Sequence, residues 1–334
     1  MRRLPTLAFL LALAVALAPP ASAKPPFKIG CTGSPRAADP GVGVSGNGYL
    51  LVSTSRVGDG LPIRGSFDGR QWCWDGRTRA FARKPGWVFA RSSYWAPEIR
   101  LANGRYVILY SAFKAGRKGR NTGRRCLGIA RSTGAIGTSF SGPGRPLFCA
   151  PGNRYIDPSL FVEGGRAYVL YKEDRHFNAK GPRRLDRKVI VIRRLLRGDK
   201  LGRRHQLLQA SQPWEIARPG QSPWPSAEAP TLIRNGGLYY LFYSGNLFNG
   251  KRYGVGVARS TKLLGPYKKL PQNPILGSFR NPKRCGLGHQ DISFTPRDGL
   301  RLYFHAKPTC AAKRRYLSFR TFTFKGGWPS VPVR

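Results

Sequence analysis

Acidic side chains are scarce in this sequence. Its 334 residues contain 15 Asp and Glu against 58 Lys and Arg, which gives a formal net charge of +43. With so few carboxylates, an acid placed directly before an apolar run is a poor candidate for solubilising surface. Glu228, in the stretch AEAPTLIRNGGLYYLFYSGN, is such an acid. The excess of positive charge argues for contact with polyanions.

Long apolar runs are missing after the N-terminus. Arg2 and Arg3 precede LAFLLALAVALA, and Ala21-Ser22-Ala23 follows as a small-residue cleavage site, so residues 1–23 are interpreted as a secretory signal peptide. No later stretch approaches the roughly 18 apolar residues of a spanning helix. We expect an extracellular protein without a transmembrane anchor and with one domain over residues 24–334; an uncleaved N-terminal anchor is the alternative.

The sequence also lacks the cysteine spacing that is typical of zinc sites. None of the six cysteines forms a C-x-x-C pair near a histidine, and an even number in an exported chain favours disulfides. Six cysteines allow 15 pairings. Proximity along the chain suggests Cys126 with Cys149 and Cys285 with Cys310, which leaves Cys31 and Cys73.

A sustained helical period is the last feature that the sequence lacks, and its 28 Pro and 41 Gly would interrupt one. A different pattern recurs, a Gly turn followed by a short aromatic and β-branched run, at intervals of about 60 residues. Its copies are GNGYLLVSTS (46–55), ANGRYVILYSA (102–112), GGRAYVLYKE (164–173), GGLYYLFYSG (236–245) and DGLRLYFHA (298–306).

This repeat predicts the fold class. A unit of about 60 residues is too long for a hairpin and suits a four-stranded sheet with its loops. A single sheet of this size cannot bury both of its apolar faces. Packing several such sheets around an axis lets each sheet cover the faces of its neighbours. We therefore predict an all-β, five-bladed β-propeller as a single domain; a β-sandwich with insertions is the alternative.

Acids occupy related places in the repeat. The strand that enters each Gly hairpin begins near an acid followed by Pro or Ala-Pro: Asp39 in AADPGVGV, Asp157 in YIDPSLFV and Glu228 in AEAPTLIR. Proline disfavours a helical turn in the preceding residue, so we expect an extended chain that aims these side chains at a common point. The innermost strands of a propeller line its central channel, which places the acids at one mouth.

Taken together, DPGV, WAPEI, IDPSLF, EAPTL and GHQD, each leading into a Gly turn, resemble glycoside hydrolase family 43. The resemblance spans the mature chain and implies a five-bladed propeller acting on arabinan, xylan and related side chains, with no cofactor required. It implies roles for Asp39 as general base, Glu228 as general acid, and Asp157 as the residue that tunes the pKa of the acid and orients it.

These roles agree with acetal chemistry. An inverting hydrolase needs one carboxylic acid to protonate the leaving oxygen and one carboxylate to activate water. A third carboxylate nearby would raise the pKa of Glu228 and keep it protonated. The structural alternative is that Asp39 is an Asp-Pro turn residue and that Asp157 and Glu228 bond backbone amides. We expect structural roles for Glu98 and Asp291.

Aromatic and histidine side chains complete the predicted site. Trp95, Tyr94 and Trp224 precede the strand starts and could pack against the apolar faces of sugar rings. His289 resembles a fifth-blade histidine that lies beneath the active site and, in some members of the family, binds a central calcium ion directly or through water. Imidazole is a poor ligand for so hard a cation, so a water-mediated or hydrogen-bonding role is favoured.

Two classes of function remain open. The first is a secreted inverting glycosidase that cleaves α-L-arabinofuranosyl or β-xylosyl linkages in polysaccharide, and the second is a non-catalytic polysaccharide-binding propeller at the cell surface. Basic runs such as KAGRKGRNTGRR (114–125) and AAKRRY (311–316) suggest contact with an anionic cell-wall polymer, or compositional bias alone. No nucleic-acid reading motif is present. We expect a monomer.

Overall fold

Antiparallel strands dominate the computed structural model, which describes residues 30–46, 48–133, 139–152, 154–174, 188–217, 224–278 and 283–332. Helical segments in these ranges include the short 3₁₀ turns η1 (Arg117–Gly119) and η2 (Pro213–Glu215). None of the helices in the described part has both the length and the apolar character that a membrane crossing requires. The predicted signal peptide, residues 1–23, lies outside the described residues.

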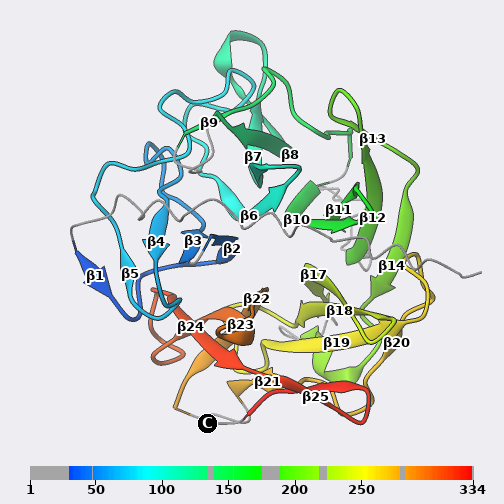
Figure 1. The fold of residues 1–334 in the computed structure, drawn as a ribbon. Helices are drawn as coiled ribbons and strands as arrows, with labels where there is room; N and C mark the ends of the chain where they lie inside the picture. The colour runs from blue at the N-terminus through cyan, green and yellow to red at the C-terminus, as the bar shows by residue number, and fades with distance from the viewer. Residues whose placement is uncertain are drawn as a thin grey trace, which may run out of the picture.

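Five antiparallel sheets surround a common centre (Figure 1), so the predicted five-bladed propeller is confirmed. Blade one contains β2 (Gly41–Ser45), β3 (Gly48–Val52), β4 (Arg64–Ser66), β5 (Trp72–Cys73) and β1 (Cys31–Thr32). Blade two contains β6 (Trp95–Ala102), β7 (Arg105–Ala115), β8 (Asn121–Ser132) and β9 (Phe140–Ser141). Blade three contains β10 (Arg154–Glu163), β11 (Arg166–Asp174), β12 (Lys188–Leu196), β13 (Lys200–Leu201) and β14 (His205–Gln209).

The remaining blades follow the same plan. Blade four contains β17 (Ala227–Asn235), β18 (Leu238–Gly245), β19 (Gly254–Ser260), β20 (Lys268–Lys269) and β21 (Leu276–Gly277). Blade five contains β22 (Cys285–Thr295), β23 (Gly299–Lys307) and β24 (Tyr316–Thr321). Two small hairpins stand apart from the blades: β15 (Ile216–Ala217) with β16 (Trp224–Pro225), and β25 (Thr323–Lys325) with β26 (Trp328–Ser330). In Figure 1 the strands β2, β6, β10, β17 and β22 lie nearest the centre.

The core is distributed between the blades. Buried apolar residues form separate clusters, and each cluster joins two neighbouring blades. Leu50 and Val52 of blade one, for example, pack with Ile99 and Tyr110 of blade two. A single blade leaves an apolar face exposed, and its neighbour covers it, which is why the repeat needs the full ring.

The ring is closed by the start of the chain. The N–H of Ala37 donates to the carbonyl of Arg315 at 3.2 Å, and the N–H of Leu317 donates to the carbonyl of Pro35 at 2.9 Å. Residues 35–37 therefore run along β24 of blade five before the chain enters β2 of blade one. This contact joins the first and last blades without a covalent link.

The three suggested disulfides are confirmed. Cys31–Cys73 joins β1 to β5, and Cys126–Cys149 joins β8 to the segment that follows β9. Cys285–Cys310 joins the start of β22 to the loop between β23 and β24. The last bond anchors the loop that continues to Arg315.

The inner strand of blade one lies unusually close to blade two. A Cβ atom at Gly41 would lie 2.4 Å from the carbonyl oxygen of Pro97, and one at Gly43 would lie 2.8 Å from that of Ile99. The small sequence GVGV is therefore a packing requirement of β2 against β6. This packing brings Asp39, which precedes Pro40 and the start of β2, up to the centre of the ring.

Candidate active site

The start of every inner strand has the same unusual backbone. Values of φ in the left-handed region occur there in all five blades: 54° at Asp39, 44° at Ala96, 58° at Asp157, 51° at Ala229 and 52° at His289. Four of these residues precede proline. The expectation of an extended residue before proline is therefore wrong: proline excludes the right-handed helical turn, but the chain makes a left-handed turn instead. Such φ values cost on the order of 1 kcal/mol or more and are typical of functional sites.

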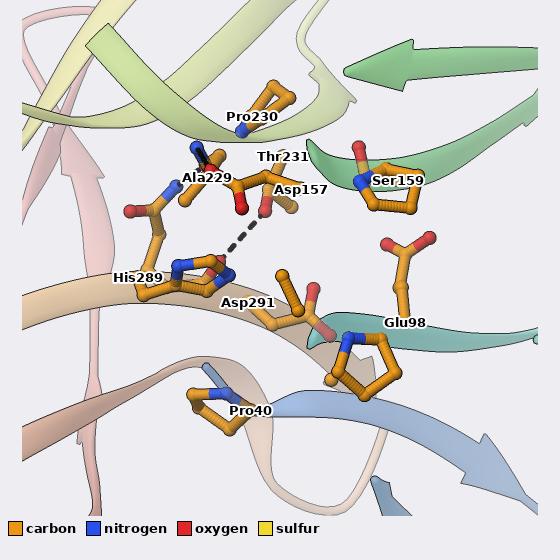
Figure 2. A pocket seen from close by; sticks show the side chains of 14 residues that line it. Pro40, Glu98, Asp157, Ser159, Ala229, Pro230, Thr231, His289 and Asp291 are labelled. Carbon is orange, nitrogen blue, oxygen red and sulfur yellow. Dashed lines mark hydrogen bonds between the residues drawn. The ribbon is translucent and has the colours of Figure 1, made fainter. Parts of the chain in front are cut away.

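Acids from three blades meet at this level of the ring. Oxygen atoms of Asp157 and Glu228 and a ring nitrogen of His289 all lie within 4.8 Å of one another. The Nδ1 atom of His289 also lies 3.3 Å from Oδ1 of Asp39. Figure 2 shows Asp157 and His289 facing a small hollow, with Glu98 and Asp291 further along it. Residues separated by up to 250 positions thus form one cluster.

Both oxygens of Glu228 accept a hydrogen bond. The ammonium group of Lys172, on β11, donates to Oε2 at 2.9 Å, and the hydroxyl of Tyr253 donates to Oε1 at 2.8 Å. Lys172 also lies 3.5 Å from Oδ1 of Asp174. Burial would lower the pKa of Lys172, but the charges of Asp174 and Glu228 raise it, so the ammonium form is retained.

The two carboxyls of Asp157 and Glu228 differ in their affinity for a proton. Burial raises the pKa of Asp157 to about 6, and the charge of Glu228 adds to the rise while that of His289 opposes it. Burial would also raise the pKa of Glu228, yet the Lys172 charge and hydrogen bond bring it below its ordinary value. When the pair holds a single proton, that proton is therefore on Asp157 rather than on Glu228.

This distribution differs from the expectation that Asp157 raises the pKa of Glu228. The repulsion between the two carboxylates is present, but its effect falls on Asp157, because Lys172 stabilises the charge on Glu228. The prediction from the sequence considered only the acids, so it did not take the charge of Lys172 into account.

Four groups surround the carboxylate of Asp39. Arg315 donates to Oδ1 at 2.5 Å and the hydroxyl of Thr54 donates to Oδ2 at 2.6 Å, while Nδ1 of His289 and Nδ1 of His305 lie 3.3 and 3.4 Å from Oδ1. Burial would raise the pKa of Asp39, but the charge of Arg315, followed by the effect of His289, brings it well below the ordinary value. Asp39 is thus ionised throughout the usual pH range.

The sequence analysis did not identify Lys172 and His305 as site residues, although they occupy equivalent positions in two copies of the repeat. Each pairs with the residue just before a left-handed strand start: Lys172 with Ile156, and His305 with Gly288. Serines hold the corresponding position in blades two and four, where Ser111 pairs with Trp95 and Ser244 with Glu228. The sequence signal that could have identified these two residues was a lysine or histidine at a position that holds serine in blades two and four.

Three comparisons place the chain among known proteins. The sequence model described as glycosyl hydrolases family 43 matches residues 32–329. The chain belongs to glycosyl hydrolase family 43. It is therefore a glycoside hydrolase, as the resemblance of its strand starts predicted.

Individual relatives of this family 43 chain are distant but cover most of it. An extracellular exo-α-(1→5)-L-arabinofuranosidase of Cellvibrio japonicus is 26% identical over 88% of this chain and 85% of its own length. An extracellular endo-α-(1→5)-L-arabinanase of Bacillus subtilis is 25% identical over 71% and 68%. The crystal structure of a thermostable family-43 glycoside hydrolase superposes with a TM-score of 0.76 at 26% identity, covering 89% of this chain and 93% of the other.

The three aromatic residues predicted to contact sugar in this family 43 site differ in their positions. Trp95 is half-buried beside Ala96 and contacts the ring of Phe113 edge-on, with centroids 4.9 Å apart. Tyr94 is 4% exposed and packs against Phe81 in the core between blades one and two. Its expected contact with sugar is therefore incompatible with its position. The side chain of Trp224 lies outside the described residues.

Glu98 and Asp291 have the structural roles expected of them. Glu98 accepts a hydrogen bond from the N–H of Leu160, which ties blade two to blade three. Asp291 accepts from the N–H of Val42 at 2.6 Å and from Arg100 at 3.0 Å, which ties blade five to blades one and two. Burial raises the pKa of Glu98 to about 8, against the opposing charge of Arg100.

The cluster fits a directly bound cation poorly. Calcium requires six to eight oxygen ligands, but Lys172 and Tyr253 already occupy both oxygens of Glu228. The Oδ2 atom of Asp157 accepts the N–H of Ala229 at 3.0 Å. These contacts engage carboxylate oxygens that direct coordination of a cation would need.

Proposed function

We propose that this family 43 enzyme hydrolyses glycosidic bonds with inversion, with Asp39 as general base, Glu228 as general acid and Asp157 as the residue that supplies and orients the proton. The observation that carries this assignment is the convergence of the three acids on His289, within 3.3 Å of Asp39 and 4.8 Å of the other two. In an inverting reaction the base and the acid act from opposite faces of the sugar ring.

The proposed reaction consumes one water molecule. Asp39 accepts a proton from this water as its oxygen bonds to the anomeric carbon, and Glu228 donates a proton to the leaving glycosidic oxygen as that bond breaks. Glu228 must first acquire a proton, and Asp157 is the neighbouring carboxyl that supplies it. Their oxygens lie within 4.8 Å of each other, a separation that one bridging water can span. The product sugar has the opposite anomeric configuration.

We infer that the substrate is a polysaccharide with α-L-arabinofuranosyl linkages, with β-xylosyl linkages as the second candidate. Two relatives are named for α-(1→5)-L-arabinan linkages, one as an exo-acting and one as an endo-acting enzyme. The test is incubation of the protein with arabinans, xylans and aryl glycosides while proton NMR follows the anomer released. Retention of configuration, or absence of hydrolysis from the whole panel, would contradict the proposal.

Glu228→Gln separates the hydrolase from a polysaccharide-binding propeller. The amide keeps nearly the same shape but cannot donate the proton, so we expect turnover to fall by about a thousandfold or more with substrate affinity retained. Thr133→Ala, on an exposed turn after β8, is the control and should keep full activity. Equal activity of both variants would exclude Glu228 as the acid.

Secretion completes the proposal. Residues 1–23 have the pattern of a signal peptide, and both named arabinan-acting relatives are described as extracellular. We infer an extracellular, monomeric enzyme that begins at residue 24, with its basic surface held near anionic cell-wall polymer. N-terminal sequencing of protein recovered from culture medium tests the cleavage site, and association with cells that is released by salt tests the electrostatic contact.

A central calcium ion bound by His289 through water is the alternative to a purely hydrogen-bonding role for this histidine, and it is not part of the proposed reaction. Because the carboxylates around His289 are already bonded to protein donors, chelation with EDTA should leave kcat unchanged and lower the melting temperature by less than about 2 °C. A loss of activity that calcium restores and magnesium does not would contradict this expectation.

A further inference from the structure

The basic run 114–125 ends in a side chain that turns toward the active site. Arg125, on β8, places its guanidinium 4.7 Å from the ring centroid of Trp95 and 5.3 Å from that of Phe113. The two rings meet edge to face, so the guanidinium and both aromatic groups form one continuous surface. We call these three residues the Arg125 platform.

Hydrogen bonds connect this platform to the catalytic cluster. Trp95 directly precedes Ala96, whose N–H donates to Oγ1 of Thr54 at 2.9 Å. The same hydroxyl donates to Oδ2 of Asp39 at 2.6 Å. The platform is thus one residue away from the contact that holds the general base of the proposed reaction.

The charge of Arg125 lacks a hydrogen-bonded anion in the described part of the chain. Its Nε atom is buried without an acceptor. Of the acids close enough to affect it, Asp174 is paired with Lys172 at 3.5 Å and Asp157 accepts the N–H of Ala229. Burial lowers the pKa of Arg125 and the charge of Arg154 lowers it further, while Asp174 and Asp157 oppose this.

A partly buried guanidinium in this situation favours an incoming anion. Buried charges are ordinarily paired, and an unpaired one loses hydration without compensation. The planar fork of arginine matches a carboxylate with two parallel hydrogen bonds. The apolar ring beside it matches the C–H face of a sugar.

We propose that the Arg125 platform is a subsite for a sugar that carries a carboxylate, that is, a uronic acid residue on the polymer next to the linkage being cleaved. This inference rests on the proposed function, since it places the uronate on the same polysaccharide. It extends the substrate class from neutral chains to acidic ones.

The test compares two forms of one ligand. Glucuronoarabinoxylan oligosaccharides are used as prepared and after chemical reduction of their carboxyl groups, and their binding is measured by calorimetry in the Glu228→Gln background, where turnover does not interfere. We expect the acidic form to bind about tenfold more tightly than the reduced form. Arg125→Met should bring this ratio close to one. Equal binding of both forms to the Glu228→Gln protein would overturn the subsite.

Matched variants distinguish a specific contact with Arg125 from general attraction by the positive charge of the protein. Arg259 stacks on Trp328 at 4.2 Å, away from the acids, so Arg259→Met removes the same charge and the same kind of contact and should keep the tenfold ratio. Arg125→Lys retains a charge but loses the fork, and should reduce the ratio to about twofold. An undiminished ratio in Arg125→Lys, or an equal decrease in Arg259→Met, would contradict a specific contact.

Failure of the subsite can be distinguished from failure of the proposed function. If the native enzyme hydrolyses both oligosaccharide forms at equal rates, the hydrolase stands and the subsite is wrong. If the acidic form binds more tightly but neither form nor any substrate of the panel is hydrolysed, the subsite stands and the proposed reaction is wrong.

Discussion

At the scale of single residues, the state of Glu228 depends on a lysine. In the proposed reaction Glu228 is the general acid and must be protonated to act. Lys172 and Tyr253 both donate to its carboxylate, which favours the ionised form. Asp157, with a pKa of about 6, is the carboxyl of the pair that binds a proton first as the pH falls. Lys172 therefore determines which of the two carboxyls binds the first proton in the free enzyme.

Lys172→Met should move the pH profile of kcat/KM. Lys172 lowers the pKa of Glu228, so its removal raises that pKa, and the acid then remains protonated to higher pH. We expect the alkaline limb of the profile to shift upward by about one pH unit or more, whatever happens to the maximal rate. The profile is measured with an aryl glycoside that the substrate panel identifies.

Lys269→Met is the matched control for this prediction. Lys269 forms an equally close ion pair with buried Glu215, at 2.7 Å, at the η2 turn away from the acids. Its loss should lower stability without moving the alkaline limb. A shift of equal size in both variants would show that loss of a buried lysine, rather than contact with Glu228, changes the profile.

At the scale of elements, the strand starts decide where side chains point. Four inner strands contain a left-handed residue, and their ladders shift register there; in blade one the corresponding residue, Asp39, lies just before β2. In blade three the left-handed residue is Asp157 itself, whereas in blade four it is Ala229, so that Glu228 is the residue before it. The repeat in the sequence identified these segments, and the change from Asp-Pro to Glu-Ala-Pro marked the offset of one residue that the ladders show.

Gly41→Ala should impair catalysis through the position of β2. The new methyl group would lie 2.4 Å from the carbonyl oxygen of Pro97 and 2.7 Å from Cα of Glu98, so β2 must move away from β6 and carry Asp39 with it. A displacement of about 1 Å can cost on the order of a hundredfold in rate. We expect kcat/KM to fall by at least tenfold in steady-state assays.

Gly86→Ala is the control, because a Cβ atom at Gly86 meets no other group within 4 Å and its φ is not in the left-handed region. Native activity in this variant would exclude a general effect of replacing glycine. Native activity in Gly41→Ala would show that Asp39 does not depend on the close packing of β2.

Two elements that the sequence marks only as basic runs contribute to the site. The run 114–125 delivers Arg125 to Trp95, and the run 311–316 delivers Arg315 to Asp39. The Cys285–Cys310 disulfide anchors the second of these loops. Charge alone predicted a surface role for both runs, because composition does not show which arginine in a run turns inward.

At the scale of the whole molecule, one arginine joins three blades. Arg100 of blade two donates to the carbonyl of Val42 in blade one at 2.6 Å and to Asp291 of blade five at 3.0 Å, and it pairs with Glu98 at 3.1 Å. These contacts lie near the centre of the ring, where inner strands have few apolar side chains to pack. They supplement the apolar clusters between the blades.

Arg100→Met should destabilise the entire propeller. The buried carboxylate of Asp291 would lose its cation, and breaking a buried ion pair costs about 3 kcal/mol or more. We expect a clear decrease in the urea midpoint of a single cooperative transition. Arg131→Met is the control, since Arg131 is 36% exposed and its pair with Asp199 should contribute at most about 1 kcal/mol. Equal midpoints for the two variants would contradict a central role for Arg100.

The repeat along the sequence by itself predicted the number of blades and the strands that enter the centre. Proximity of the cysteines along the chain suggested the disulfide pairs, and the resemblance of the strand starts marked the three acids. Tertiary structure decided the rest. Lys172, Tyr253, Arg315 and His305 reach the acids from other strands and loops, and the charge on each carboxyl depends on those neighbours. A pKa is set by distance and burial in three dimensions, and neither quantity is encoded in the spacing of residues along the chain.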